Sequence, residues 1–282
     1  MFKNKLATVL IWLVALIIII VFICILTDIM IQGVSQISWA YLTQAPSDAG
    51  REGGIAPIIV STGLIVLLAI IIAAPLGLAT AVLLSEFMQK KTLFGRFIER
   101  CLDVLASVPS IVFGLFGNAF FSLYLGLGFS ILSGGLTLAC MVLPILIRTA
   151  VEGLRAAPDD YRYSAAALGM TRYAALIHLL LPAATPAIVA GLMLGIGRAM
   201  AETAALIFTS GYVDRMPSSV FDSGRALSIH IYDLSMNVAG GDSKAHAAAL
   251  VLIVMLLIIN GLAMRFANRW QNKRITTHEI II

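Results

Sequence analysis

Long apolar stretches alternate with short polar connections along most of the chain. A helix needs about 20 mostly apolar residues to cross a bilayer, and six stretches reach roughly that length. They predict membrane-spanning helices at about Leu6–Leu26, Pro57–Leu84, Val104–Leu125, Phe129–Ile147, Ala183–Thr209 and Ala247–Ala267. We therefore expect an all-α integral membrane protein with six transmembrane helices.

Composition agrees with this pattern. The chain is 60% hydrophobic and 12% charged, whereas soluble domains are about 45–50% apolar and about 25% charged. The first apolar run is too long for a signal peptide and no small-residue cleavage site follows it, so we expect a retained anchor. The cysteines, histidines and acids show no metal-ligand spacing, which predicts neither a metal site nor a disulfide framework. The net charge of +4 does not indicate a nucleic-acid partner, because its distribution follows the membrane.

Lys and Arg are distributed unequally between the two sets of connections. Fourteen lie on the side of the two termini, four lie on the opposite side, and Arg198 lies within a span. Cytoplasmic loops carry the excess of positive charge, so both termini are expected on the cytoplasmic side of the membrane. The fourteen are Lys3, Lys5, Lys90, Lys91, Arg96, Arg100, Arg148, Arg155, Arg162, Arg172, Arg265, Arg269, Lys273 and Arg274.

These assignments divide the chain into three regions. Residues 1–56 form an anchor helix and an outside loop, residues 57–269 form the transmembrane domain, and residues 270–282 form a cytoplasmic tail. Pro75, Pro109 and Pro144 lie inside predicted spans and are expected to kink them.

The connection before the fifth span contains a short polar helix. In "AAPDDYRYSAAALGMTRYAALIHLLLP" (Ala156–Pro182), Pro158 suits a helix start, and Asp159 and Asp160 suit the first turn. Gly169 stands where a left-handed residue would end the helix. A helix of about ten residues is too short to be stable alone. It must pack on its own membrane domain or on a partner protein, and the residues alone leave both readings open.

The same connection resembles the EAA loop of the membrane subunits of binding-protein-dependent ABC importers, whose pattern is EAA-x3-G-x9-I-x-LP. Aligned on Gly169, the closing Leu-Pro falls on Leu181 and Pro182, while Tyr163 replaces the glutamate. The resemblance implies that this helix docks on a cytoplasmic ATPase, without the contact that the glutamate makes. The implied coupling residues are Asp159, Asp160, Arg162, Tyr163, Ser164, Ala165 and Gly169.

The stretch "LMLGIGRAMAETAALIF" (Leu192–Phe208) places Arg198 and Glu202 inside a predicted span. Each charge costs about 2.5–3.5 kcal/mol at the membrane centre. On a continuous helix, positions i and i+4 share a face, so the two could neutralise one another as a structural ion pair. Hydrophobic residues would hold helices together as well, and intramembrane ionisable residues usually mark a substrate path. The path is the favoured reading.

The neighbouring residues suit an oxyanion. Gly191, Gly195 and Gly197 form a small-sided face that lets another helix approach and could place Arg198 at a seam between two subunits. The arginine fork donates two parallel hydrogen bonds to a tetrahedral oxyanion. Glu202 would orient the fork or accept a proton from phosphate, and its charge would repel sulfate, which carries no such proton.

Three motifs resemble the phosphate-transport permeases. "GRAMAET" (Gly197–Thr203) is similar to their GRAxxET signature, whereas sulfate and molybdate permeases usually carry phenylalanine at the position of Thr203. "SVPSIVFGLFG" (Ser107–Gly117) is similar to another motif of that family, and "GRALSIHIYDLSMN" (Gly224–Asn237) to its PstA-type branch. The likeness runs from about Pro57 to Arg269.

The resemblance implies a type I ABC importer core of the MetI-like kind, working by alternating access. Arg198, Glu202 and Thr203 would line the substrate path. The implied partners are a homologous PstC-type permease, two copies of a PstB-type ATPase, a PstS-type phosphate-binding protein outside, inorganic phosphate and membrane lipid.

The chain itself has no P-loop, since none of its six lysines follows a glycine. We expect a transport subunit without a cofactor, with ATP and Mg²⁺ bound by the partner ATPase. Three alternatives stay open. They are a permease for sulfate, molybdate or phosphonate, an intramembrane enzyme that acts on a lipid phosphate through Arg198 and Glu202, and a purely structural scaffold.

Overall fold

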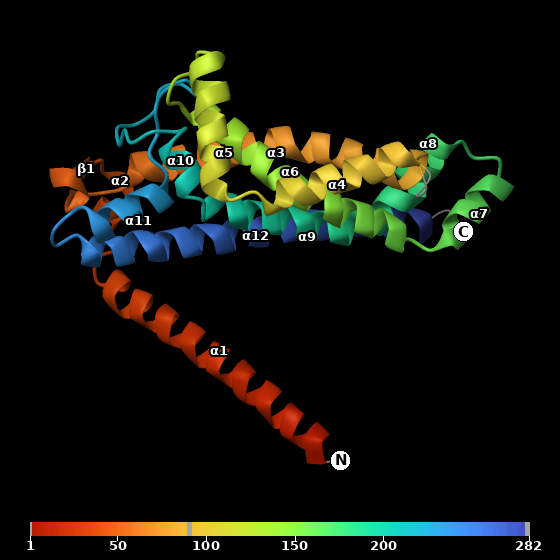
Figure 1. Cartoon of the computed structure of the whole chain (residues 1–282), viewed down its shortest axis with the longest axis horizontal. Helices are drawn as coiled ribbons and strands as arrows, with labels where there is room; N and C mark the ends of the chain where they lie inside the picture. The colour runs from red at the N-terminus through yellow and green to blue at the C-terminus, as the bar shows by residue number, and fades with distance from the viewer. Residues whose placement is uncertain (1, 89–91, 280–282) are drawn as a thin grey trace.

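The computed structural model describes residues 2–88 and 92–279, and these are almost entirely helical (Figure 1). Lys90 and Lys91, which contribute to the predicted charge asymmetry, lie outside the described residues. The α-helices are α1 (Phe2–Val34), α2 (Trp39–Thr43), α3 (Ala56–Val82), α4 (Leu93–Ser107), α5 (Ser110–Gly117), α6 (Ile131–Ala156), α7 (Asp159–Ala167), α8 (Arg172–Ala175), α9 (Leu181–Met200), α10 (Ala204–Ile207), α11 (Leu227–Met236) and α12 (Asp242–Glu279). Three π-helical segments, η2 (Leu83–Phe87), η3 (Asn118–Tyr124) and η4 (Leu176–Leu180), adjoin α3, α5 and α9.

Four long helices, α3, α6, α9 and α12, lie along one axis and form an elongated bundle (Figure 1). α6 packs on both α3 and α9, and α12 packs on α9. Within the described ranges, five helices are long and apolar enough to cross a membrane, or six if a bent pair counts as one span. The predicted all-α membrane fold is confirmed.

The two ends of the bundle differ. One, called here the α7 end, carries α7 and α8 (Figure 1). The other, called the α11 end, carries α2, the hairpin of β1 (Pro46–Ser47) and β2 (Glu52–Gly53), and α11. At the α11 end, Tyr41, Ile55 and Ile58 are buried together with Leu227 of α11. The first long polar loop and α11 therefore fold together into a cap over this end.

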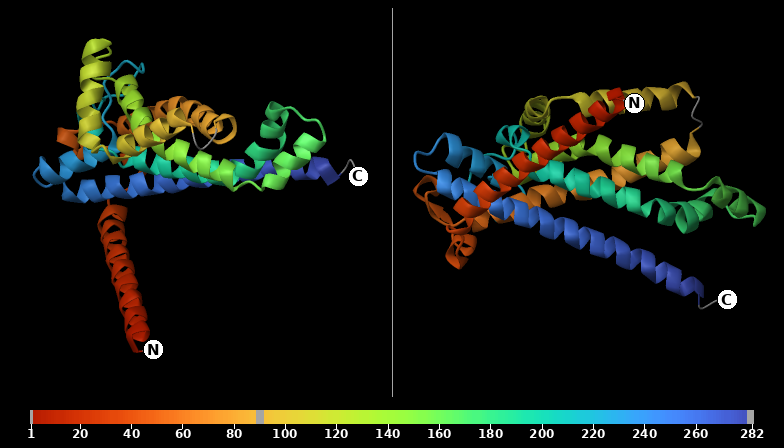
Figure 2. Two further views of the ribbon diagram at one scale, coloured as in Figure 1. Left: turned by 45° about the vertical axis from the view of Figure 1, so that its right-hand side comes forward. Right: turned by 90° about the horizontal axis from the view of Figure 1, so that it is seen from below.

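α1 stands apart from the bundle (Figure 2). It touches α12 and otherwise extends away from the other helices, and its apolar window has no buried residue. Gly33 marks the contact, because a Cβ there would lie 2.8 Å from the His246 carbonyl oxygen. This helix is longer than the predicted span Leu6–Leu26, since it continues through residue Val34.

The predicted third span, Val104–Leu125, is not one helix. α4 ends at Ser107, α5 begins at Ser110, and the two parts are bent by 99°. Pro109 lies at the break and Val108 before it is extended, because a residue that precedes proline is disfavoured in the α conformation. Pro75 and Pro144, by contrast, lie within the continuous helices α3 and α6.

α4 is amphipathic, and its charged side faces α6. Arg155 donates to Glu99 over 2.9 Å, and Arg148 pairs with Asp103. These four side chains line a groove of about 260 Å³ between the helices. The two acids of α4 are therefore paired with α6, while Leu93, Phe94 and other apolar side chains of α4 are exposed.

The fifth predicted span, Ala183–Thr209, is also interrupted. α9 ends at Met200, and the short α10 begins at Ala204. In a continued helix the Glu202 carbonyl would accept a bond from the backbone four residues on. It accepts instead from the Ser228 hydroxyl of α11, over 2.6 Å. The contact with α11 thus satisfies a carbonyl that the end of the helix leaves free.

Candidate functional site

Arg198 lies in the last turn of α9, and its side chain is exposed. Among the described residues no hydrogen bond or ion pair involves it. An arginine inside a membrane span is rare and normally finds a partner or a watery cavity. The open side of Arg198 can therefore receive an anion or a group from another subunit.

Glu202 is turned inward and is only 8% exposed. Its Oε1 accepts the Ala205 backbone N–H over 3.2 Å at the start of α10, as a capping carboxylate does. Thr203 is the N-cap residue of α10 and is half-buried. The predicted same-face pairing with Arg198 is absent between these two described residues, because the helix ends between them.

The glycine face of α9 is used mainly inside this chain. Gly191 lies against Thr149, and a Cβ at Gly195 would lie 2.6 Å from the Val142 Cγ1 of α6. At Gly197 the nearest atom would be Leu256 Cδ1, at an ordinary 3.9 Å. Gly191 and Gly195 thus let α6 pack closely on α9, whereas Gly197 has space around it.

α7 agrees with the helix predicted from the punctuation of the sequence. It spans Asp159–Ala167, follows Pro158, and ends before Gly169, whose φ is +66°. Asp159 and Asp160 occupy its first turn, and Ala165 is buried. Its exposed side chains include Tyr163, which is 72% exposed, and Tyr161, together with the two aspartates, and Leu168 and Tyr173 are exposed just beyond it. This surface of α7 is free for a partner.

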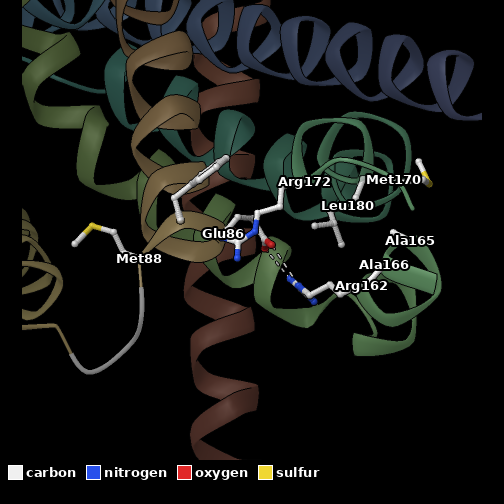
Figure 3. Close-up of a pocket in the computed structure, with 10 residues that line it drawn as sticks. Glu86, Met88, Arg162, Ala165, Ala166, Met170, Arg172 and Leu180 are labelled. Atoms are coloured by element: carbon white, nitrogen blue, oxygen red, sulfur yellow. Dashed lines mark hydrogen bonds and ion pairs between the residues drawn. The ribbon is translucent and has the colours of Figure 1, made fainter. Parts of the chain in front are cut away.

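Arg162 points in the opposite direction, toward the bundle (Figure 3). Its Nε donates to Glu86 Oε2 over 3.3 Å, and its Nη2 donates to Glu86 Oε1 over 2.7 Å. These hydrogen bonds raise the pKa of the Arg162 guanidinium above its usual value. Sequence reasoning grouped Arg162 with the docking residues and missed Glu86. The available signal was that Glu86 is the first acid after Glu52 and ends a long apolar run.

Beside this contact lies a groove of about 450 Å³ (Figure 3). It lies between η2 and the segment of α7, α8 and η4. Its lining includes Glu86, Phe87, Arg162, Met170, Arg172 and Leu180.

The cap at the α11 end holds a buried histidine. His230 is 1% exposed, its Nδ1 has no hydrogen-bond partner in the described structure, and Gly50 lies against the ring. Burial, reinforced by the positive charge of Arg225, lowers the pKa of His230 to about 4, against the opposing effect of Asp214 and Asp233. The imidazole is therefore neutral at pH 7.

Comparison with known proteins defines the class. The family described as binding-protein-dependent transport system inner membrane component matches residues 73–277, and this chain belongs to that family. It is a multi-pass membrane permease of an ABC importer, a transport subunit and not an enzyme.

Three relatives are similar over most of their length. "Probable ABC transporter permease protein YqgI" of Bacillus subtilis is 30% identical over 98% of both chains. "Phosphate transport system permease protein PstA" of Xylella fastidiosa is 32% identical over 81% of this chain and 80% of its own. The protein of the same name from Mycobacterium leprae is 31% identical over 94% of this chain and 89% of its own.

Solved structures show the same fold. A chain of a bacterial ABC transporter that imports the polysaccharide alginate superposes with a TM-score of 0.66 at 17% identity, covering 95% of this chain and 98% of its own. A chain of the MetNI methionine ABC transporter, in an inward-facing conformation, gives 0.54 at 16% identity, covering 78% and 94%. The expected MetI-like core of a type I importer is confirmed.

Proposed function

We propose that this chain is one of two permease subunits of an ATP-driven importer of inorganic phosphate in a bacterial inner membrane. The naming of PstA relatives as phosphate transport permeases supports the substrate. A homologous PstC-type permease completes the path, and two PstB-type ATPases bind ATP and Mg²⁺. A PstS-type binding protein delivers phosphate from outside.

The observation that carries the proposal is the different placement of Arg198 and Glu202. Arg198 is exposed without a partner in the described chain, whereas Glu202 is buried and caps α10. An arginine that no carboxylate among the described residues neutralises is available to a divalent oxyanion. Glu202 lies four residues after Arg198, at the helix break, and its carboxylate provides a negative charge near the path.

Transport requires that Arg198 hold phosphate weakly, since a tight site would not release it. In alternating access, the two halves of the path open in turn to either side. Thr203, at the junction between α9 and α10, would contribute a hydroxyl close to this point.

In this proposal the α7 end and both termini lie in the cytoplasm. The excess of Lys and Arg on the connections at this end supports this orientation. The exposed side of α7, which includes Tyr161 and Tyr163, would then face the ATPase. Asp159, Asp160, Ser164, Ala165 and Gly169 shape and terminate this docking helix.

Uptake in a reconstituted importer tests the proposal. All four components are placed in vesicles with ATP, and labelled phosphate is supplied with an excess of sulfate, molybdate or methylphosphonate. We expect phosphate uptake that requires ATP and the binding protein and that none of the three competitors reduces. Equal competition by any one of them would assign the permease to that oxyanion instead.

A further inference from the structure

We propose that Arg162 and Glu86 form an internal strut that fixes α7 to the bundle and transmits its movement, so that Arg162 is a positioning residue for coupling. This inference rests on the proposed function, in which α7 receives the motion of the ATPase. Arg162 then makes its contact within this chain and not with the ATPase. Glu86 gains a role that the sequence alone did not indicate.

The guanidinium of Arg162 uses all of its hydrogen-bonding capacity. Arginine has five N–H donors. Besides the two bonds to Glu86, Nη1 donates to the Ala157 carbonyl over 3.1 Å and to Asp159 Oδ1 over 3.2 Å. Nη2 also donates to the Leu154 carbonyl, over 2.9 Å. Five donors meet five acceptors, so Arg162 has no donor left for another protein.

The acceptors belong to three different elements. Glu86 lies in η2, which continues α3, and Leu154 and Ala157 lie at the C-terminal end of α6. Asp159 lies in the first turn of α7 itself. The last carbonyls of a helix lack partners within it and carry partial negative charge, so a cation is favoured there. One side chain of α7 thus joins the ends of the two long helices that make the most extensive packing in the bundle.

The strut is also better shielded than the other ion pairs at this end. The side chains of Arg162 and Glu86 are 28% and 14% exposed, whereas Arg155 and Glu99 are 31% and 47% exposed. Shielding from water strengthens the pair and makes the loss of one partner more costly. A π-helical segment such as η2 often occurs at functional positions, and here it presents the Glu86 carboxylate toward α7.

A rigid joint of this kind has a mechanical consequence. If α7 were held only by apolar contacts, a force on it could tilt α7 without moving α3 and α6. With the strut, displacement of α7 pulls on η2 and on the end of α6 together. Removing the strut should therefore let ATP be hydrolysed without opening the path.

The test measures ATP hydrolysed per phosphate imported in vesicles that contain the complete importer. Arg162→Gln and Glu86→Gln should each raise this ratio about tenfold, the order of typical coupling free energies between sites. Arg162→Lys keeps the charge but loses the planar fork, so its ratio should also be higher than that of the wild type. The double variant should equal the single variants, because both remove the same unit. Arg155→Gln is the matched control and should behave as the wild type.

A merely structural role predicts a different result. Fewer assembled complexes would lower uptake and hydrolysis together and leave their ratio unchanged. An unchanged ratio in assembled Arg162→Gln and Glu86→Gln importers, or an equal rise in Arg155→Gln, would overturn the strut. If Arg162→Gln does not assemble, Glu86→Gln and Arg162→Lys decide by the same ratio.

Failure of the proposed function gives a separate signature. If the wild-type importer takes up no phosphate, the substrate assignment is wrong. The strut is then judged by the ATPase rate of the assembled complex without binding protein, which must change in Glu86→Gln and not in Arg155→Gln.

Discussion

The Ser228 hydroxyl donates a 2.6 Å hydrogen bond to the backbone carbonyl of Glu202. The two residues are 26 positions apart, and both are buried. The bond connects α11, in the cap, to the break between α9 and α10, close to Arg198. A movement of α11 would therefore displace the break between α9 and α10, where the proposed anion path passes.

Ser228→Ala removes the donor and leaves the Glu202 carbonyl buried without its partner, at a cost of about 1–3 kcal/mol. We expect phosphate uptake to fall severalfold while the complex still assembles. Uptake and membrane level are measured together. Ser35→Ala, which removes an exposed hydroxyl at the end of α1, is the control and should change neither. Normal uptake by Ser228→Ala would show that the bond does not matter for transport.

Glu202→Gln separates the charge of Glu202 from its capping role. The amide oxygen of glutamine can still accept the Ala205 N–H, so α10 should keep its start. The lost negative charge should let sulfate compete with phosphate, which it does not do in the wild type. Competition curves for sulfate against labelled phosphate check this, and a curve identical to the wild type would contradict it.

Gly195 and Gly197 offer a matched pair of substitutions. A methyl group at Gly195 would meet Val142 Cγ1 at 2.6 Å, whereas at Gly197 the nearest atom is 3.9 Å away. Gly195→Ala should therefore destabilise the packing of α9 on α6 by about 1–3 kcal/mol, and Gly197→Ala should not. The thermal unfolding midpoint in detergent compares the two variants. Equal midpoints would show that α6 and α9 are packed differently.

His230 predicts a pH dependence of the cap. Its pKa is about 4 in the folded chain and about 6.5 when unfolded. The unfolded state thus binds a proton that the folded state does not, so stability is full above pH 6.5 and falls as the pH drops toward 4. The loss is about 3 kcal/mol at most. Thermal midpoints at pH 7 and pH 5 should differ more in the wild type than in His230→Phe. An equal pH effect in both would assign it to other groups.

Local signals in the sequence predicted much of this structure. Pro158, the two aspartates and Gly169 together predicted α7 and its end, because helix start and stop depend on neighbouring residues. Long apolar runs likewise predicted the membrane-spanning helices. The sharp bend at Pro109 was expected only as a kink, since proline marks a break without fixing its angle.

The parts that depend on distant contacts were not predictable from one sequence. The end of α9 at Met200 involves Ser228, and the inward direction of Arg162 involves Glu86, 76 positions earlier. A pattern that places Arg198 and Glu202 on one face assumes that the helix continues. The helix ends at Met200 instead, and α11 satisfies the carbonyl left free there, so the two charges take separate positions.

The central claim is that Arg198 belongs to the anion path. The most direct test is labelled phosphate uptake by the complete importer carrying Arg198→Gln, with assembly and ATPase activity measured in the same preparation. Arg51→Gln, which alters an exposed arginine paired with Asp48, is the control. The account predicts that Arg198→Gln abolishes uptake while assembly and ATPase activity persist. Uptake at the wild-type rate would show that phosphate passes without Arg198 and would contradict the account.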